Sequence, residues 1–455
     1  MDHIEEKILR IIDENADKII AFGDDIWHHA ELGFMEYRTS EKFVEQMKAL
    51  GLSIETGIAI TGSKAYLKER KEDEVNIALI GEMDALPIAN HPDANPDTGA
   101  VHACGHDAQI TGVMGAAIAL SDPEIREALG GNVTFIGMPS EEQAAMTAER
   151  KKEYSESGKL KYFGGKVEFM HLGAMDDIDL AVGHHVMGDG REYGIGNGPS
   201  WGFMDKHVTF TGRASHIGTA HNGVDAQGAA VLAVTAINAQ REGLPRFFSY
   251  NKHLVHCALQ SSAPAVNVVV DEAKMTVNFR GMNMEALQDL GYRIDRAVRG
   301  ASVAMGTGMK IETEAGYMPV LPIKDASIVA DVFNVIDPEH KHPVINHETT
   351  GCTDYGDLSQ IMPVIQFYTG GHNGEAGHSL KFNVADKKEY YVAPAKAFAL
   401  LAYRLLKNNA EQAKKILQEN QPPLTKEQYF QIVDSMGSVE EMEMVPAPYY
   451  EKLGM

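Results

Sequence analysis

The apolar residues of this chain follow two spacings. Between residues 3 and 50 they recur every three or four positions, which predicts amphipathic helices. Four later runs are continuous and as long as a buried strand: 75–83, 132–138, 178–182 and 363–368. Strands buried on both faces are typical of an open sheet covered by helices. We therefore expect an α/β fold.

The pattern changes between residues 206 and 298. The predicted elements are a half-exposed strand, a helix, two antiparallel strands and a helix, at 206–211, 224–239, 266–270, 274–280 and 284–298. This order is typical of a compact α+β unit of the split βαβ, ferredoxin-like kind. We expect it to be inserted into the first domain, because the apolar run at 363–368 comes after it.

The length of 455 residues favours roughly two to three domains. We expect a discontinuous α/β domain made of residues 1–190 and 316–455, with the α+β unit at 191–315 between its parts. The last stretch, 412–455, is acidic and contains proline. We expect it to be a tail that packs on the surface or is partly ordered.

Charge and cysteine content limit the partners and the compartment. The chain has 41 basic and 64 acidic residues, a net charge of −23, which argues against nucleic acid or an anionic membrane as a partner. The 3 cysteines are few and far apart, so a reducing compartment is expected. The first residues lack the pattern of a secretion signal, and no apolar run is long enough to span a bilayer. We expect a cytoplasmic location.

The run 101–107 contains Cys104, Gly105 and His106, which suggest a metal site. A thiolate and an imidazole suit a divalent transition metal, and the glycine lets the backbone bend so that both can converge. The tripeptide alone is weak evidence, because a buried cysteine beside a surface histidine is its commonest setting.

Further acidic and imidazole groups follow the predicted strands. The pair Glu141 and Glu142 comes after 132–138, His185 comes after 178–182, and His378 comes after 363–368. Ligands of open α/β sheets gather at the carboxyl ends of the strands, so these groups are expected in one crevice. The five candidate ligands are Cys104, His106, Glu142, His185 and His378. They exceed the needs of one tetrahedral zinc, so two metals sharing the set, or one metal with outer support, are both possible, and we favour two.

Two carboxylates near these ligands have candidate roles. Adjacent side chains on a loop diverge, so Glu141 can act as a general base on a metal-bound water while Glu142 binds the metal. Asp84, at the end of the run 75–83, is suited to hold a ligand imidazole in one tautomer. The competing interpretation of each is a solvated acidic side chain.

The α+β unit offers three further candidates. His216 follows the predicted strand 206–211, although a single histidine there is more often ordinary surface. Asn267 and Arg280, on the paired strands, can donate hydrogen bonds to a substrate carboxylate. An arginine on a strand is otherwise typical of a salt bridge.

Eight motifs in order give the chain a resemblance to a known family. They begin at Gly81, His102, Pro139, Gly183, Thr211, Asn267, Cys352 and Gly377. Together they resemble the metallo-aminoacylase and carboxypeptidase family, in the amidohydrolase branch with hippurate hydrolase, indoleacetyl-amino acid hydrolase and aminobenzoyl-glutamate hydrolase. The run that begins at Trp27 also resembles the opening motif of that branch. The resemblance covers roughly residues 20–405.

The resemblance implies a catalytic domain with a di-metal centre and an inserted lid through which the protein forms a homodimer. It implies the five ligands above and Glu141 as the base that later protonates the leaving amine. The donor types suit Zn²⁺ or Mn²⁺, with Co²⁺ also suitable. His216 would steady the oxyanion, in many relatives across the dimer, and Asn267 and Arg280 would hold the substrate's carboxylate. The implied reaction is hydrolysis of an N-acyl or aryl-amido amino acid or a small dipeptide.

Departures from the family pattern leave the substrate open. The branch usually has alanine where this chain has Ser140, and the charged segment 143–177 differs from its Gly-rich counterpart. Two other functions compete with the enzyme: a non-catalytic relative that binds a small molecule, and a structural zinc protein. Every expected position is filled, and Glu141 lies beside the candidate ligands, which favours the enzyme.

Overall fold

The computed structural model describes the chain except for residues 72, 143–145, 187–192, 196–197, 244–252, 262–264, 339–348 and 445–455. It divides into two compact units. The first unit is Met1–Pro199, Leu321–Glu348 and Asp357–Pro423, and the second is Ser200–Val320, Thr349–Gly356 and Leu424–Met455. In the described part of the chain, no helix combines the length and apolar character needed to cross a membrane.

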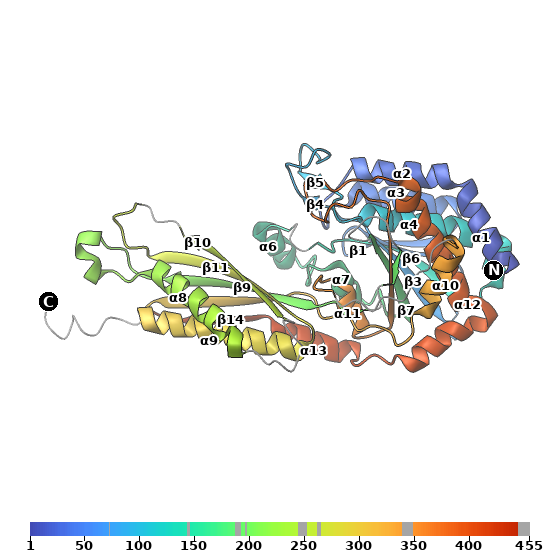
Figure 1. The fold of residues 1–455 in the computed structure, drawn as a ribbon. Coiled ribbons are helices and arrows are strands. Elements are labelled where there is room, and N and C mark those ends of the chain that lie inside the picture. Colours follow the sequence, from blue (N-terminus) through green and yellow to red (C-terminus); the bar gives the residue numbers. More distant parts are fainter. Residues whose placement is uncertain are drawn as a thin grey trace. The chain divides into compact units, whose positions relative to one another are not determined.

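The first unit is built on a mixed sheet (Figure 1). Its strand order is β1 (Ser53–Ile58), β2 (Gly62–Tyr66), β6 (Asn132–Met138), β3 (Asn76–Glu82), β7 (Leu180–Val186), β13 (Val364–Thr369) and β8 (Gly194–Ile195). The strands β6, β3, β7 and β13 are parallel neighbours, and every residue of β3 and β6 is buried. The four continuous apolar runs are these strands, so the predicted α/β sheet is confirmed.

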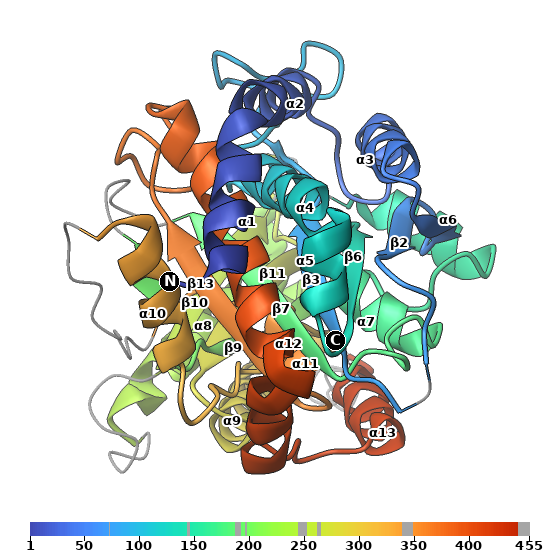
Figure 2. The same ribbon diagram turned by 90° about the vertical axis from the view of Figure 1, so that its right-hand side faces the viewer.

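The helix α4 (His106–Leu120) lies at the centre of the helical layer. It packs on β3 and against α1 (His3–Glu14), α2 (Ala16–His28) and α12 (Ala393–Glu419), and Figure 2 shows α1, α4 and α12 in front of the sheet. All but one of its residues are buried, because its glycines and alanines let neighbouring helices approach closely. This packing fixes the start of α4, where His106 lies.

Shorter elements complete the chain outside the second sheet. They are α3 (Tyr37–Ala49), β4 (Leu86–Pro87), β5 (Ala100–Val101), α5 (Pro123–Ala128), α6 (Ala148–Glu156), α7 (Gly165–His171), α10 (Ser327–Ile336), α11 (Tyr355–Ser359) and the π-helix Lys388–Val392.

The second unit is an antiparallel sheet with two helices. The strand order is β10 (His253–Ser261), β11 (Glu272–Gly281), β9 (Gly202–Thr211), β12 (Gly308–Ala315) and β14 (Ser438–Met442). The helices α8 (Ala226–Ala239) and α9 (Met284–Met305) pack on each other and on this sheet, where they share one apolar core. Two 3-10 helices, Ile217–Asn222 and Gln240–Gly243, complete the unit with α13 (Lys426–Met436).

One predicted strand of this unit is wrong. Residues 266–270 form a loop with one isolated bridge, and Val266 is 100% exposed. The antiparallel partner of β11 is β10 instead, in continuous register from His253 opposite Gly281. The β-branched residues of 266–270 favour a strand, but strand propensity is decided by packing partners, and this run has few.

The C-terminal segment differs from the prediction, which placed 316–455 with the first domain and expected 412–455 to pack on the surface or to be partly ordered. Leu424–Met455 instead belongs to the second unit, and residues 445–455 lie outside the described residues. In the structure α13 begins at a capping box made by Thr425 and Gln428, and β14 pairs with β12. Arg299 donates two hydrogen bonds of 2.5 Å to Glu440 on β14. An edge strand carries unpaired backbone groups, and β14 satisfies those of β12.

Candidate metal centre

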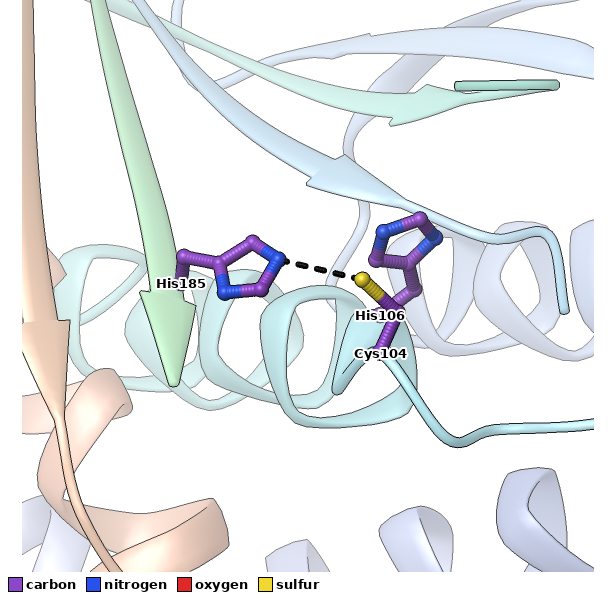
Figure 3. A group of neighbouring side chains, drawn as sticks. All are labelled: Cys104, His106 and His185. Atoms are coloured by element: carbon purple, nitrogen blue, oxygen red, sulfur yellow. Dashed lines mark hydrogen bonds between the residues drawn. The ribbon is translucent and has the colours of Figure 1, made fainter. Parts of the chain in front are cut away.

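The tight turn before α4 places Cys104 and His106 on the same side. Gly105, between them, has φ 85°, and a Cβ atom there would lie 2.6 Å from a methyl of Val186, so glycine is required on both counts. Cys104 Sγ is 3.3 Å from Nε2 of His185, which β7 supplies (Figure 3).

The donor atoms of the five predicted ligands form two groups that share one residue. One group is Cys104, His106 and His185, and the other is Cys104, Glu142 and His378, with the donor atoms of each group within 4.8 Å of one another. His378 Nε2 lies 3.3 Å from Cys104 Sγ and 3.1 Å from Glu142 Oε1. The structure therefore brings the five predicted ligands together, with the thiol at the point that both groups have in common.

Asp84 holds two parts of this cluster. Its Oδ1 and its backbone oxygen each accept from His106 Nδ1 at 3.0 Å, so the Nε2 lone pair of neutral His106 faces the cluster. Its Oδ2 accepts from the backbone N–H of Glu142 at 2.8 Å. Burial raises the pKa of Asp84, but His106 and the N–H donors outweigh burial and lower it below its usual value. Asp84 is thus an ionised group that orients the imidazole of His106.

The electrostatics of the cluster suit a cation. Burial, with the charge of Glu142, raises the pKa of the Cys104 thiol well above its usual value, so a thiolate there needs a positive partner. Burial lowers the pKa of His106, but the charges of Glu82, Cys104 and Asp84 outweigh it and raise the pKa well above its usual range. Among the described residues His106 Nε2 has no hydrogen-bond partner. Sulfur, imidazole and carboxylate donors fit divalent transition metals.

Glu141 lies beside the donor groups. It is 7% exposed, and its Oε2 is 3.9 Å from His106 Nε2. The preceding Ser140 has φ 44°, a left-handed conformation that costs energy for a residue with a side chain. Its N–H donates to the buried Glu36 at 2.9 Å, and this contact supports the turn that carries Glu141.

Comparison with known proteins identifies the family. The sequence profile of peptidase family M20/M25/M40 matches residues 78–403, more than half of the chain. The chain belongs to this family. The resemblance noted from the sequence motifs is thereby confirmed.

Among relatives of this M20-family protein, an N-acyl-L-amino acid amidohydrolase of Geobacillus stearothermophilus is 26% identical over 70% of this chain and 81% of its own length. An N-acetylcysteine deacetylase of Bacillus subtilis is 27% identical over 86% of this chain and 97% of its own length. The solved structure of the Bacillus subtilis YXEP protein, described as a dinuclear metal binding peptidase, has a TM-score of 0.63 at 23% identity, over 86% and 98% of the two chains. That likeness shows the shared fold.

Sequence reasoning missed two charged residues beside the cluster of this M20 chain. Glu82, at the end of β3, has its Oε2 3.1 Å from His106 Nε2, and Lys166 of α7 donates to its Oε1 at 2.5 Å. The available signal was a single acidic residue in the otherwise apolar run 75–83. The partner lysine, 84 positions later, gives no local signal.

The candidates of the second unit lie in two places. His216 is exposed and begins the 3-10 helix Ile217–Asn222, where its Nδ1 accepts from Gly218 N–H at 3.0 Å. The backbone oxygen of Asn267 accepts from Ile217 N–H at 2.9 Å, so the loops that carry His216 and Asn267 are neighbours. Arg280 is on β11, where it donates to Asn278 Oδ1 and to the backbone oxygen of Thr350.

Proposed function

We propose that this M20-family chain is a metal-dependent amidohydrolase that cleaves N-acyl or aryl-amido amino acids or small dipeptides. The observation that carries the proposal is the convergence of five donors on two overlapping groups that share Cys104, with Glu141 beside them. Such an arrangement suits two divalent ions, for which we propose Zn²⁺ or Mn²⁺, with Co²⁺ also suitable.

Metal ions bound here would polarise the scissile carbonyl and lower the pKa of a bound water to about 7. In this proposal Glu141 accepts the proton of this water and passes it to the leaving amine, and the position of its carboxylate near His106 in a buried setting supports this role. Asp84 keeps His106 in the tautomer whose Nε2 faces the donors.

The second unit supplies the remaining proposed groups. His216 is exposed, and its Nδ1 accepts from Gly218, which leaves Nε2 as the ring nitrogen to donate to an oxyanion. Asn267 and Arg280 are proposed to bind the carboxylate of the amino acid portion of the substrate. Arg280 is suited to this because its guanidinium carries five donors.

The relatives support hydrolysis over binding alone. The Geobacillus and Bacillus proteins are named as an amidohydrolase and a deacetylase of acylated amino acids. A non-catalytic relative is expected to lack a ligand or the base, and here all five donors and Glu141 are present.

We also propose that the protein is a cytoplasmic homodimer formed through the second unit. Within the described residues β10 is one edge of the sheet, and it exposes Leu254 and Leu259 at 46% and 45%. The neighbouring α8 exposes Val231 and Leu232. An edge strand beside exposed apolar side chains is a suitable surface for a second copy. Light scattering on the wild type and on Leu259→Lys tests this assembly.

The experiment that tests the proposed function is turnover of a substrate panel by the purified protein. The panel contains acyl amino acids, aminobenzoyl-glutamate and dipeptides, each assayed after chelation and after return of Zn²⁺ or Mn²⁺. Metal-dependent release of a free amino acid from one group supports the hydrolase and names its substrate class. Bound metal without cleavage of any member would favour the binding relative.

A further inference from the structure

Glu36 is a buried acid that immediately precedes α3 but does not cap that helix. Its side chain is 0% exposed and makes no capping hydrogen bond. The first turn of α3 is capped by Glu31 instead, whose carboxylate accepts from the N–H groups of Arg38 and Thr39 at 3.1 and 2.8 Å. A carboxyl group buried without hydrogen bonds is costly, so the position of Glu36 must depend on partners elsewhere in the fold.

Both oxygens of Glu36 have buried partners from other parts of the chain. Oε1 accepts from the backbone N–H of Ser140, 104 positions away, at 2.9 Å. Oε2 lies 2.6 Å from Oγ1 of Thr61, the residue before β2. Ser140 and Thr61 are 0% and 3% exposed. A hydroxyl group can donate or accept, so Glu36 can keep both contacts in its protonated and its ionised form.

Ser140 has a backbone conformation that needs support from its surroundings. Its φ of 44° lies in the left-handed region, which is strained for a residue with a side chain. Its backbone oxygen accepts from Gly165 N–H at 2.9 Å, and its Oγ donates to the backbone oxygen of Phe163 at 3.3 Å. Its N–H donates to Glu36. Such strain persists only where surrounding contacts hold it, and Glu36 supplies the contact on the N–H side.

The turn at Ser140 carries the candidate general base. Glu141 follows directly and is 7% exposed. On its other side, the N–H of Glu142 donates to Oδ2 of Asp84 at 2.8 Å. The backbone on the two sides of Glu141 is therefore held by two different buried acids. Loss of the Glu36 contact should change the direction of Glu141, whereas Asp84 should still hold Glu142.

We propose that Glu36 is a positioning residue for the general base: by accepting from the Ser140 N–H, it fixes the turn that aims Glu141 at the attacking water. The inference rests on the proposed function, in which Glu141 is that base. The group that acts is the hydrogen-bond acceptor Oε1 rather than a charge. A base held out of place slows the chemical step, while the side chains that bind the ions and the substrate are unchanged.

The test compares Glu36→Met with Glu36→Gln. Both side chains match glutamate in length, but only glutamine keeps an acceptor for the Ser140 N–H. Glutamine also resembles the protonated acid, because burial and then the charge of Asp84 raise the pKa of Glu36 to about 8.

Steady-state kinetics use the member of the substrate panel that the wild type cleaves fastest, and elemental analysis counts the ions. We expect Glu36→Met to lower kcat at least about tenfold with KM and ion content unchanged, and Glu36→Gln to keep kcat within about threefold of the wild type.

Crystal structures of the ion-free wild type and of both variants test the geometry without any substrate. In Glu36→Met the Ser140 N–H loses its acceptor, so we expect φ of Ser140 to become negative and Glu141 to move away from His106. In Glu36→Gln both residues should stay as in the wild type. A further variant, Thr61→Val, removes the hydroxyl beside Oε2 and should lower kcat by a smaller factor. It replaces Glu36→Met in the kinetic test if the methionine variant does not fold.

A matched control removes an acceptor of a backbone N–H at the other end of β6. Asn132, the first residue of this strand, is 0% exposed, and its Oδ1 accepts from Lys68 N–H at 3.0 Å. Asn132→Leu should lower the melting temperature, as Glu36→Met should, because each leaves a backbone N–H without its partner. It should not lower kcat, since Asn132 begins the strand whose other end leads to Glu141. The control thus separates lost stability from lost positioning.

The outcomes separate this inference from the proposed function. If the wild type is active and Glu36→Met keeps its kcat or the positive φ of Ser140, Glu36 does not position Glu141, and the proposed function stands. A fall of kcat together with ion content would show that Glu36 acts through Glu142, and an equal fall in Glu36→Gln would show that the acceptor is not what matters; either result overturns the inference. If the wild type binds ions but cleaves no member of the panel, the proposed function and this inference fail together.

Discussion

The two units hold their candidate functional residues in opposite surroundings. In the first unit His378 is exposed, but Asp84, His106 and Glu141 are between 0% and 7% exposed, and each of these three lies in a network of side chains and backbone amides. In the second unit His216 and Asn267 are exposed, and the contacts near them run mainly to the backbone.

This difference indicates that the candidate residues of the two units have different roles. Buried charges must be satisfied by fixed partners, which gives the preorganised geometry that a metal ion and a general base need. Exposed donors cost little to leave solvated, so they suit a substrate that comes and goes. Changes of the metal donors in the first unit should therefore alter ion binding, a change of Glu141 should lower turnover while the ions stay bound, and changes in the second unit should alter kcat or KM without altering ion content.

The largest effect is expected from Cys104→Ala. Because Cys104 belongs to both donor groups, its loss should weaken binding of both ions by more than about 100-fold and abolish turnover. Elemental analysis after dialysis measures the ions. Retention of both ions would show that the thiol is not shared.

Glu141→Gln should lower kcat about 1000-fold, because the amide cannot accept the proton of the attacking water. The ions and the melting temperature should stay as in the wild type, since the shape of the side chain is unchanged. Steady-state kinetics with ion counting checks both expectations. Turnover close to the wild-type value would remove Glu141 from the mechanism.

His216→Ala should lower kcat about 100-fold through loss of an oxyanion donor. Ion content should not change, because His216 belongs to the second unit and to neither donor group. Mixing this variant with Glu141→Gln tests whether the histidine acts across a dimer. Recovery of activity in the mixture requires sharing between subunits, and its absence points to action within one chain.

Arg280→Lys should raise KM about tenfold and leave kcat and ion content nearly unchanged, because lysine keeps the charge but loses the planar pair of donors. The comparison uses a substrate with a free carboxylate and the same substrate as its amide. A KM that rises equally for both would mean that Arg280 does not contact the carboxylate.

The smallest effect on turnover is expected from Glu36→Gln. Burial, and then the charge of Asp84, raise the pKa of Glu36 to about 8 from its usual value of 4.5. The folded state thus keeps a proton that the unfolded state releases, so this group makes stability fall as pH rises from 4.5 to 8.

Glutamine has no such proton, so Glu36→Gln should flatten the decline in unfolding free energy over that range. Denaturant unfolding of the metal-stripped protein at pH 5 and at pH 8 measures the slope. An unchanged slope would show that Glu36 is ionised in the folded state.

Sequence reasoning succeeded where the pattern was local. The buried strands are continuous apolar runs, and the candidate ligands lie at or beyond their carboxyl ends. The clustering of these ligands could therefore be predicted from the sequence alone. The structure agrees in bringing these side chains together.

Prediction from the sequence failed where the structure of a residue or strand depends on a partner that is distant in the chain. Glu82 looks like a single acid in an apolar strand, and only the fold brings Lys166 to it. The run 266–270 has strand-forming residues but no neighbouring strand to pair with. By contrast, β10 and β14 are partly exposed strands whose formation depends on the strands that they pair with.

The central claim is that two ions bound by the Cys104 cluster make the chain an amidohydrolase. The most direct test is the rate of amide hydrolysis by chelator-stripped wild-type protein as Zn²⁺ or Mn²⁺ is returned in measured amounts. We predict a rate below about 1% of the maximum without ions, rising to a plateau at two ions per chain. Hydrolysis that proceeds equally well in the stripped protein would contradict the account.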